Sequence, residues 1–322
     1  MRKNLILILL AILSITFLSC QRGNDQAGGA PKIAFVMKTA NNPFFIEMQK
    51  GAEDAAKKLG VSLIVQAADR EVDVEKQMQI VENLIQTKVA ALCVTPSGSR
   101  EIVPAIDKAN RAGIPVLIID TRVDAKALAE SKGKVAAFIG SDNYEGGKLA
   151  GEFIAKRLGG KGKVAVLEGI PGHETGDSRL RGFRDAIKSA PGIEVVASQT
   201  ANWERDQGFN VFQNILQSHP DVQAVFACSD LMALGAVEAI AAAKKTGQIV
   251  VVGFDASAEA RDAIGRGAMD ATVAQSPAMM GALAVENAYH LIKGEGIKEE
   301  IVVPIKLITK ENAGSTDTNN KN

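Results

Sequence analysis

The stretch IAFVMKTANNPFF, residues 33–45, indicates the fold class and contains the first residues of a candidate ligand-binding site. Its apolar first half is typical of a buried strand. Asn-Asn-Pro then stops the strand, because proline lacks an amide donor and asparagine tolerates turn dihedrals. The two phenylalanines begin an amphipathic helix that we predict to end at Leu59. Beside a lysine and two amides, these rings either cap a hydrophobic core or face a ligand with apolar faces and polar edges.

Short apolar runs alternate with helical patterns along the rest of the chain. Strands that alternate with helices predict a parallel sheet covered on both faces, with right-handed crossovers. The pattern occurs twice, since the run at 32–36 is similar to that at 163–167, and 114–120 to 249–255. We therefore predict two similar, doubly wound α/β lobes. The expected strands are 33–37, 61–66, 89–95, 114–120, 135–140, 163–168, 193–199, 222–228, 249–254 and 271–275, and the expected helices are 44–59, 73–87, 100–112, 145–158, 178–190, 205–218, 230–245, 257–267 and 277–293.

The composition favours two lobes and excludes partners that need a strong field. The chain has 322 residues and is 46% hydrophobic, enough for one large core or two ordinary ones. Its 37 Lys and Arg balance its 37 Asp and Glu. Because its net charge is zero, the chain has no overall electric field that would attract nucleic acid or a charged membrane surface. Its partners must therefore be recognised through local sites.

The N-terminus has the pattern of a lipoprotein-type signal peptide, residues 1–20. Two basic residues precede an apolar run, 5–18, that is too short for a comfortable membrane span. The run ends at FLSC, which resembles the bacterial lipobox with Cys20 as the acylated residue, although Phe17 stands where leucine is usual. An ordinary secretory signal cut nearby is the alternative. We expect a flexible tether at 21–31, a polar tail at 313–322, and a periplasmic or cell-surface protein anchored through lipidated Cys20.

Features of an enzyme are weak in this sequence. His173, His219 and His290 lack metal-ligand spacing and pair with no visible nucleophile. The glycine-rich run before His173 lacks the Gly-Lys-Ser/Thr of a phosphate loop. Cys93 and Cys228 lie in apolar strands, where a thiol is usually a small buried hydrophobe. We therefore expect no enzyme, no metal and no cofactor.

Polar or aromatic side chains follow nearly every predicted strand at its carboxyl end. Ligands of two-lobed α/β proteins bind in the crevice at these ends. Asp230 begins a helix and is most simply a cap, whereas Arg179, Trp203 and Gln275 cap nothing in the usual way. The candidate ligand-binding residues are Lys38, Asn42, Phe44, Phe45, Asp120, Thr121, Arg122, Arg179, Trp203, Ser229, Phe254, Asp255 and Gln275.

These side chains suit a small neutral polyhydroxy compound. Aromatic rings suit its C–H faces, and charged groups suit its hydroxyl rim because charge-assisted hydrogen bonds are strong. Asp120 and Asp255 accept hydrogen bonds, and Lys38 and Arg179 donate them. Two acids and two bases leave the site near neutrality, which favours a neutral sugar over a phosphate or a carboxylate.

Several segments resemble the ribose-binding protein family of periplasmic sugar-binding proteins, type I fold, from residue 32 to about 310. They are NNPFF at 41–45, SDN at 141–143, GGK at 146–148, RLRGF at 179–183, DVQAVFA at 221–227, MALGA at 232–236, VVGFD at 251–255 and ATVAQ at 271–275. The resemblance implies two lobes joined by a three-segment hinge, with 32–140 plus about 276–303 in the N-terminal lobe and 141–275 plus about 304–312 in the C-terminal lobe. It also implies closure over one sugar and delivery to an ABC transporter permease. We interpret 140–147 as part of the hinge rather than as a ligand contact, and 301–308 as a run that can cross between the lobes.

The same resemblance assigns contacts residue by residue. Family contacts carry over to Asn42, Phe44, Phe45, Asp120, Arg179, Phe254, Asp255 and Gln275, and Trp203 replaces a stacking phenylalanine. Three positions depart from ribose binders: Lys38 replaces a serine, Thr121 an arginine and Ser229 an asparagine. Lys38 before Thr39 is similar to allose-type members, and Arg122 is a candidate replacement for the missing arginine. These features imply a pentose, a hexose or a cyclic polyol, and favour ribose only weakly.

Two functions remain open at this point. The first is an extracytoplasmic, monomeric solute-binding protein of an ABC importer. The alternative is a ligand sensor of the same fold for chemotaxis or two-component signalling, whose partner is a chemoreceptor or sensor kinase and whose ligand is a sugar-like signal such as autoinducer-2. The sequence does not separate them, because both need the same closure.

Overall fold

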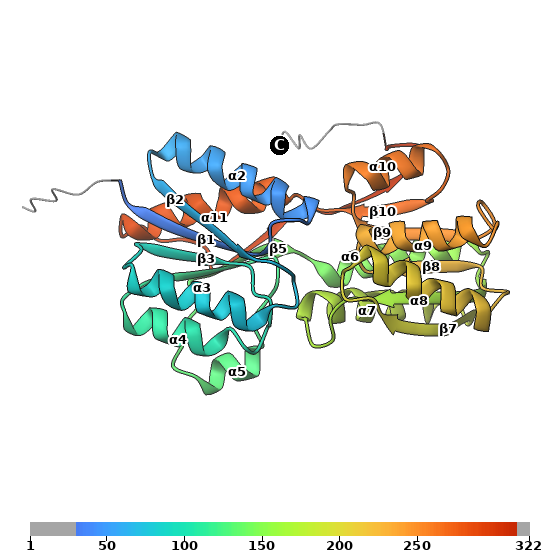
Figure 1. Ribbon diagram of the computed structural model, residues 1–322, viewed down its shortest axis with the longest axis horizontal. Helices are drawn as coiled ribbons and strands as arrows, with labels where there is room; N and C mark the ends of the chain where they lie inside the picture. Colours follow the sequence, from blue (N-terminus) through green and yellow to red (C-terminus); the bar gives the residue numbers. More distant parts are fainter. Residues whose placement is uncertain (1–29, 314–322) are drawn as a thin grey trace, which may run out of the picture. The chain divides into compact units, whose positions relative to one another are not determined.

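The computed structural model describes residues 30–313, so the predicted signal peptide with Cys20 lies outside the described residues. Residues 32–313 form one compact unit that contains two six-stranded sheets (Figure 1). The first part of the chain forms β1 (Lys32–Thr39), α2 (Pro43–Leu59), β2 (Ser62–Ala68), α3 (Val74–Gln86), β3 (Ala91–Val94), α4 (Val103–Arg111), β4 (Val116–Ile119), α5 (Ala125–Glu130) and β5 (Ala137–Ser141).

The second part repeats this alternation and ends with two short strands. Its elements are α6 (Asn143–Arg157), β6 (Lys161–Glu168), α7 (Glu174–Ile187), β7 (Gly192–Thr200), α8 (Arg205–Ser218), β8 (Ala224–Ala227), α9 (Asp230–Ala242), β9 (Val250–Asp255), α10 (Ala258–Gly265), β10 (Ala271–Ala274), α11 (Pro277–Ile292), β11 (Glu300–Val303) and β12 (Lys306–Thr309).

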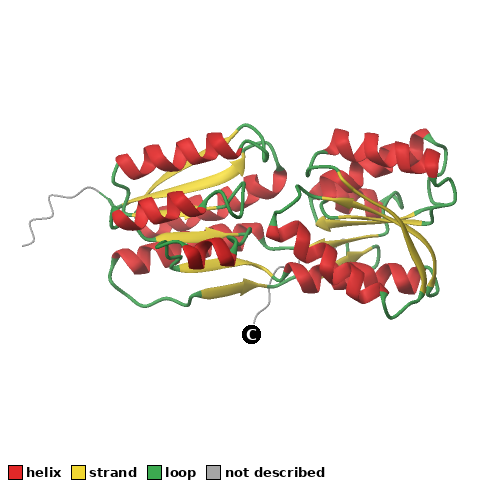
Figure 2. Ribbon diagram, turned by 90° about the horizontal axis from the view of Figure 1, so that it is seen from below, coloured by secondary structure: helices red, strands yellow, loops and turns green. Residues whose placement is uncertain are grey.

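The two sheets have matching strand orders, β11-β5-β4-β3-β1-β2 and β12-β10-β9-β8-β6-β7. Every pairing is parallel except that of β12, which is antiparallel to β10. Helices cover both faces of the strands (Figure 2). The predicted fold class, two similar lobes with doubly wound parallel sheets, is therefore confirmed.

Strand β1 shows why its sequence is an unbroken apolar run. Successive side chains point to opposite faces of a strand, and both faces of this one are buried. Phe35 and Met37 pack in the core beneath α2 and α11, while Ala34 and Val36 pack in the core beneath α3 and α4 (Figure 1). At the carboxyl end, Asn42 stops the strand and caps α2, since its side chain accepts a hydrogen bond from the Phe44 amide at 3.0 Å.

Three segments connect the lobes. They lie between β5 and α6, between β10 and α11, and between β11 and β12. The final apolar run is broken at Pro304 into β11, which extends the first sheet, and β12, which extends the second. Gly147 follows the first segment and lies so close to the Arg179 carbonyl of α7 that a Cβ would clash with it. This glycine therefore allows α6 to pack tightly on α7.

Two elements differ from the sequence prediction, and the first of them affects the site. The helix expected to begin at residue 178 begins at Glu174, because the polar first turn, with Glu174 and Asp177, is favourable at a helix N-terminus. The short helix α5 was not predicted. It is only six residues long and is capped by Asp124, whose side chain accepts a hydrogen bond from the Ala127 amide.

Candidate functional site

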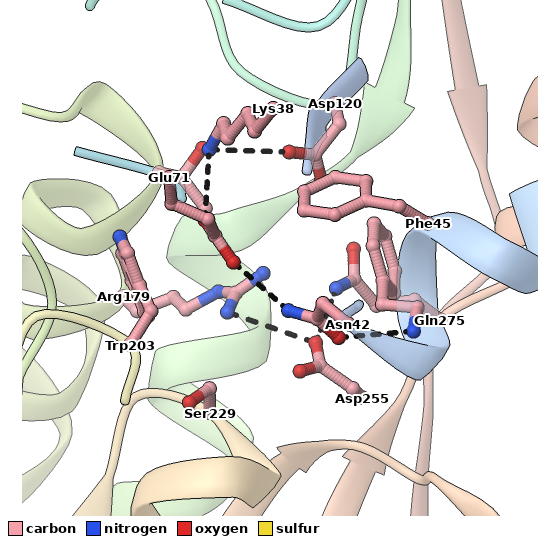
Figure 3. Close-up of a pocket in the computed structure, with 12 residues that line it drawn as sticks. Lys38, Asn42, Phe45, Glu71, Asp120, Arg179, Trp203, Ser229, Asp255 and Gln275 are labelled. Atoms are coloured by element: carbon pink, nitrogen blue, oxygen red, sulfur yellow. Dashed lines mark hydrogen bonds and ion pairs between the residues drawn. The ribbon is translucent and has the colours of Figure 1, made fainter. Parts of the chain in front are cut away.

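The carboxyl ends of strands from both lobes meet around a small cavity whose lining comes from both sheets. Figure 3 shows the lining side chains of the two lobes facing one another. The lining residues are Lys38, Asn42, Phe44, Phe45, Glu71 and Asp120 from the first lobe, and Thr175, Arg179, Trp203, Ser229, Asp255 and Gln275 from the second.

A buried lysine between two carboxylates forms one wall. Lys38, at the end of β1, is only 2% exposed. Its Nζ atom lies 3.8 Å from an oxygen of Glu71 and 3.8 Å from an oxygen of Asp120. Asn42 links this group to the start of α2, because its Nδ2 donates to Glu71 Oε1 at 2.9 Å. The donors and acceptors of this wall thus hold one another in place.

Phe44 and Phe45 serve the core and the cavity together. Both are buried, both belong to the hydrophobic core beneath α2, and both line the cavity. Their rings pack edge to face with centroids 5.3 Å apart. The two interpretations of the Phe-Phe pair are therefore compatible.

Arg179 is the fixed cation of the second lobe. Its guanidinium donates to Asn143 Oδ1 at 2.8 Å and to the Cys228 carbonyl at 2.6 Å, and it lies 3.6 Å above the Phe254 ring centroid. Its Nη1 atom is also 3.8 Å from Asp255 Oδ1. With several partners on different elements, the group is preorganised and has little freedom to leave the cavity wall.

Two polar atoms at the cavity have no partner within the described part of the chain. Gln275 donates through Nε2 to Asp255 Oδ1 at 2.8 Å, but its Oε1 atom is buried and unpaired there. The Trp203 Nε1 atom, a donor, is also buried and has no hydrogen-bond partner in the described residues. Buried polar groups nearly always find a partner, so this pair of one acceptor and one donor fits a ligand rich in hydroxyls.

The charge of the site differs from the sequence prediction, because Glu71 adds a third carboxylate to Asp120 and Asp255. Burial raises the pKa of Glu71, and the neighbouring Lys38 charge opposes this shift. Burial also raises the pKa of Asp255. The charge of Arg179 lowers this pKa, and the charge of Asp230 raises it further. Burial thus favours the uncharged forms of Glu71 and Asp255, which works against an excess of negative charge in the cavity.

Three of the predicted residues do not line the cavity. Thr121 donates to Asp120 Oδ2 at 2.9 Å and contacts Thr175 of the other lobe at 3.0 Å between hydroxyl oxygens. Phe254 supports Arg179 from behind. Arg122 points elsewhere, with Nη2 2.6 Å from Glu300 and its guanidinium above the Phe138 ring. The structure thus gives no support to Arg122 as a substitute for the arginine of ribose binders.

Glu71 and Thr175 line the cavity and were missed. Glu71 comes shortly after β2, so a search of that strand's carboxyl end for polar residues would have found it. Thr175 lies in the first turn of α7, a segment expected to be a loop. Its position depends on where the helix begins, which the glycine-rich sequence did not indicate.

The lobes are in contact around the cavity. The Glu174 amide donates to Ser99 Oγ at 3.3 Å, the hydroxyls of Thr121 and Thr175 meet, and Arg70 lies 3.6 Å from a carboxylate oxygen of Glu204. Each contact joins one lobe to the other, so this is a closed arrangement. Among residues 30–313, no helix has the length and apolar character needed to cross a membrane, and no cluster of three or more acidic, histidine or cysteine side chains has the geometry of a metal site.

Two α/β lobes that enclose a polar cavity lined by aromatic rings define a two-lobed ligand-binding protein. Residues 33–296 match the periplasmic binding protein domain family, and the chain belongs to that family. It is 41% identical over 279 residues to the ribose import binding protein of Bacillus subtilis, with 87% of each chain covered. It is 39% identical to the D-allose-binding periplasmic protein of Escherichia coli, over 82% of this chain and 85% of that one.

A solved structure gives the same result. The periplasmic solute-binding protein of an ABC transporter from Actinobacillus succinogenes, with bound D-allose, has a TM-score of 0.83 and is 41% identical, covering 88% of this chain and 99% of that one. The resemblance to ribose-binding and allose-binding proteins predicted from the sequence is confirmed. Family membership also makes this an extracytoplasmic solute-binding protein, a class that carries out no catalysis.

Proposed function

We propose that this protein is the solute-binding component of an ABC importer and captures a neutral monosaccharide or cyclic polyol by closing its two lobes. The observation that carries the proposal is the cavity between the lobes, where Lys38, Asn42 and Asp120 of one lobe face Arg179, Asp255 and Gln275 of the other. The names of relatives support import over ligand sensing through a chemoreceptor or sensor kinase.

Closure of the lobes increases the affinity for the ligand, because it adds the contacts of the second lobe to those of the first. A sugar bound to one lobe of an open protein satisfies only part of its hydroxyls. The opposing lobe adds its charged donors and acceptors only when the lobes meet, so the ligand favours the closed state by the free energy of those added contacts. The closed form then presents surfaces of both lobes to the permease. Because one chain supplies both walls of the cavity, we propose that the monomer is the active form.

The candidate ligands are D-ribose and D-allose, which name the relatives, and myo-inositol as a cyclic polyol. Isothermal titration of the protein, after unfolding and refolding to remove any carried ligand, tests them. We expect at least one to bind with a dissociation constant of about 10 μM or lower, roughly 7 kcal/mol of binding free energy. A phosphorylated sugar is the control, and we expect no heat from it. If no neutral compound binds below millimolar concentration, the proposal is wrong.

We also propose that Cys20 is lipidated and holds the protein at a membrane surface through the 21–31 tether. The support is the FLSC sequence at the end of the apolar run. Mass spectrometry of the N-terminal peptide is expected to show a diacylglyceryl thioether on Cys20, and Cys20→Ser is expected to release the protein into the soluble fraction. An unmodified N-terminus at another cleavage site would refute this.

A further inference from the structure

Asp230 is a buried carboxylate that stands next to the proposed site without lining it. It is the first residue of α9 and is 1% exposed. Sequence analysis favoured a capping role. In the structure the cap is Ser229, whose side chain accepts a hydrogen bond from the Met232 amide. The carboxylate of Asp230 is therefore free to bind other segments.

Both carboxylate oxygens of Asp230 hold the turn that follows β9. Oδ2 accepts from the Ser257 amide at 2.7 Å. Oδ1 accepts from Thr272 Oγ1 at 2.7 Å, and this hydroxyl accepts in turn from the Ala256 amide at 3.2 Å. The two amides that come directly after Asp255 thus depend, one directly and one through Thr272, on a single carboxylate.

The turn needs such support because its backbone is strained. Asp255 has a φ of 116° and Ala256 a φ of 54°, and both values are unfavourable for residues with a Cβ. Gly253, two residues earlier, leaves the space that the carboxylate occupies, since a Cβ there would clash with Asp230 Oδ1. Backbone and side chain are thus adapted to each other at this point.

We propose that Asp230 is a positioning residue that holds the strained Asp255–Ala256 turn so that the Asp255 carboxyl faces the bound sugar. This inference rests on the proposed function. Without the support, the turn relaxes and Asp255 leaves its place between Arg179 and Gln275.

The electrostatics of the pair agree with this geometry. Burial raises the pKa of Asp230, while its hydrogen bonds with Thr272 and Ser257 and the charge of Arg179 lower it. The charge of Asp230 in turn raises the pKa of Asp255, which also faces Arg179, Gln275 and the more distant Asp120. Removing the charge of Asp230 is therefore expected to lower the pKa of Asp255.

The test compares Asp230→Asn, Thr272→Val and Thr272→Ser with the unchanged protein. Asparagine keeps the shape but cannot accept at both positions, valine removes the relay, and serine restores it. For D-ribose and D-allose we expect a loss of affinity of about tenfold or more for the first two and little change for the third. The matched control is Asp206→Asn, an exposed aspartate in the first turn of α8, which should bind as the unchanged protein does.

Two further readouts separate positioning from general damage. Affinity measured between about pH 5 and 9 should show its carboxyl-dependent midpoint shifted to lower pH in Asp230→Asn. A loss of affinity with an unmoved midpoint, or affinity equal to that of the unchanged protein, overturns the inference. If Asp230→Asn does not fold, the Thr272 pair decides, and equal affinity of the valine and serine variants overturns it.

A ligand-free crystal structure of Asp230→Asn keeps the inference independent of the proposed function. We expect the φ angles of Asp255 and Ala256 to leave their present values of 116° and 54°. An unchanged turn overturns the inference even if no sugar binds. Failure of the unchanged protein to bind any neutral sugar, beside a relaxed turn in the variant, refutes the proposed function alone.

Discussion

The surroundings of the buried Lys38 side chain show that the site depends on balanced charge. Lys38 is enclosed with Glu71 and Asp120, each 3.8 Å from its Nζ atom. Burial of any one of these charges is unfavourable by itself, and removing one partner of a buried pair costs far more than the pair contributes. The closed state therefore tolerates the group only as a whole.

Lys38→Met is expected to weaken sugar binding by about a hundredfold, roughly 3 kcal/mol, because closure would then bury the two neighbouring carboxylates of the first lobe without their cation. The double variant Lys38→Met/Glu71→Gln should recover part of the loss, since one of the unpaired charges is gone. Titration calorimetry measures both. If the double variant binds more weakly than Lys38→Met, the loss comes from missing ligand contacts rather than from unpaired charge.

Asp255 gives a second residue-scale prediction. Asp255→Ala removes a hydrogen-bond partner of Gln275 and of the proposed sugar in a closed cavity, which should cost roughly 2–3 kcal/mol, or about a hundredfold in affinity. Asp255→Asn is the control: it keeps a polar group of the same shape, and the raised pKa of Asp255 indicates that a neutral side chain is tolerated there. A dissociation constant unchanged in Asp255→Ala would remove this residue from the site.

Most of the candidate site could be predicted residue by residue because polar groups at strand ends are visible in a sequence. Arg179, Trp203 and Gln275 were chosen because they cap nothing, and all three line the cavity. Arg122 lies outside the cavity lining because neighbours in sequence need not point in the same direction, and it pairs with Glu300 on β11. That partner comes from a strand far away in the chain, so no local pattern indicates it.

At the scale of elements, alternating apolar and helical segments sufficed to predict the two sheets, but not details that depend on tertiary contact. The antiparallel direction of β12 follows from its return to β10 after β11 has paired with β5. The first amide of α7 likewise meets Ser99 of the other lobe. Neither contact leaves a periodic signal in the sequence.

The packing of α6 on α7 yields an element-scale prediction. A Cβ at Gly147 would clash with the Arg179 carbonyl, so Gly147→Ala should force the helices apart and cost about 1–3 kcal/mol of unfolding free energy. Because Arg179 lies at that contact, sugar affinity should fall as well. Urea denaturation and calorimetry measure the two effects. Gly265→Ala, at the end of α10 with open space around it, is the control and should change stability by less than about 0.5 kcal/mol.

At the scale of the whole molecule, a histidine lies buried at the boundary of the lobes. His173 precedes α7 and is 4% exposed. Burial, together with the nearby Lys38 charge, lowers its pKa to about 3, although a hydrogen bond with the Ser97 backbone opposes the shift. When the lobes separate, water should reach the ring and return its pKa to about 6.5. The closed state therefore favours the neutral imidazole.

The sign of the pH effect follows from these two pKa values. Above about pH 6.5 the ring is neutral in both states and closure costs no proton; as the pH falls toward 3, the open state gains a proton that the closed state cannot hold. Affinity should thus drop by up to about tenfold per pH unit below 6.5. Glu71 and Asp255, with raised pKa values, act in the opposite direction. The affinity ratio of His173→Gln to the unchanged protein isolates the histidine, and we expect it to rise by roughly 25-fold from pH 7 to pH 5. A constant ratio would mean that His173 is equally buried before and after closure. The boundary along which the lobes separate would then not pass this residue.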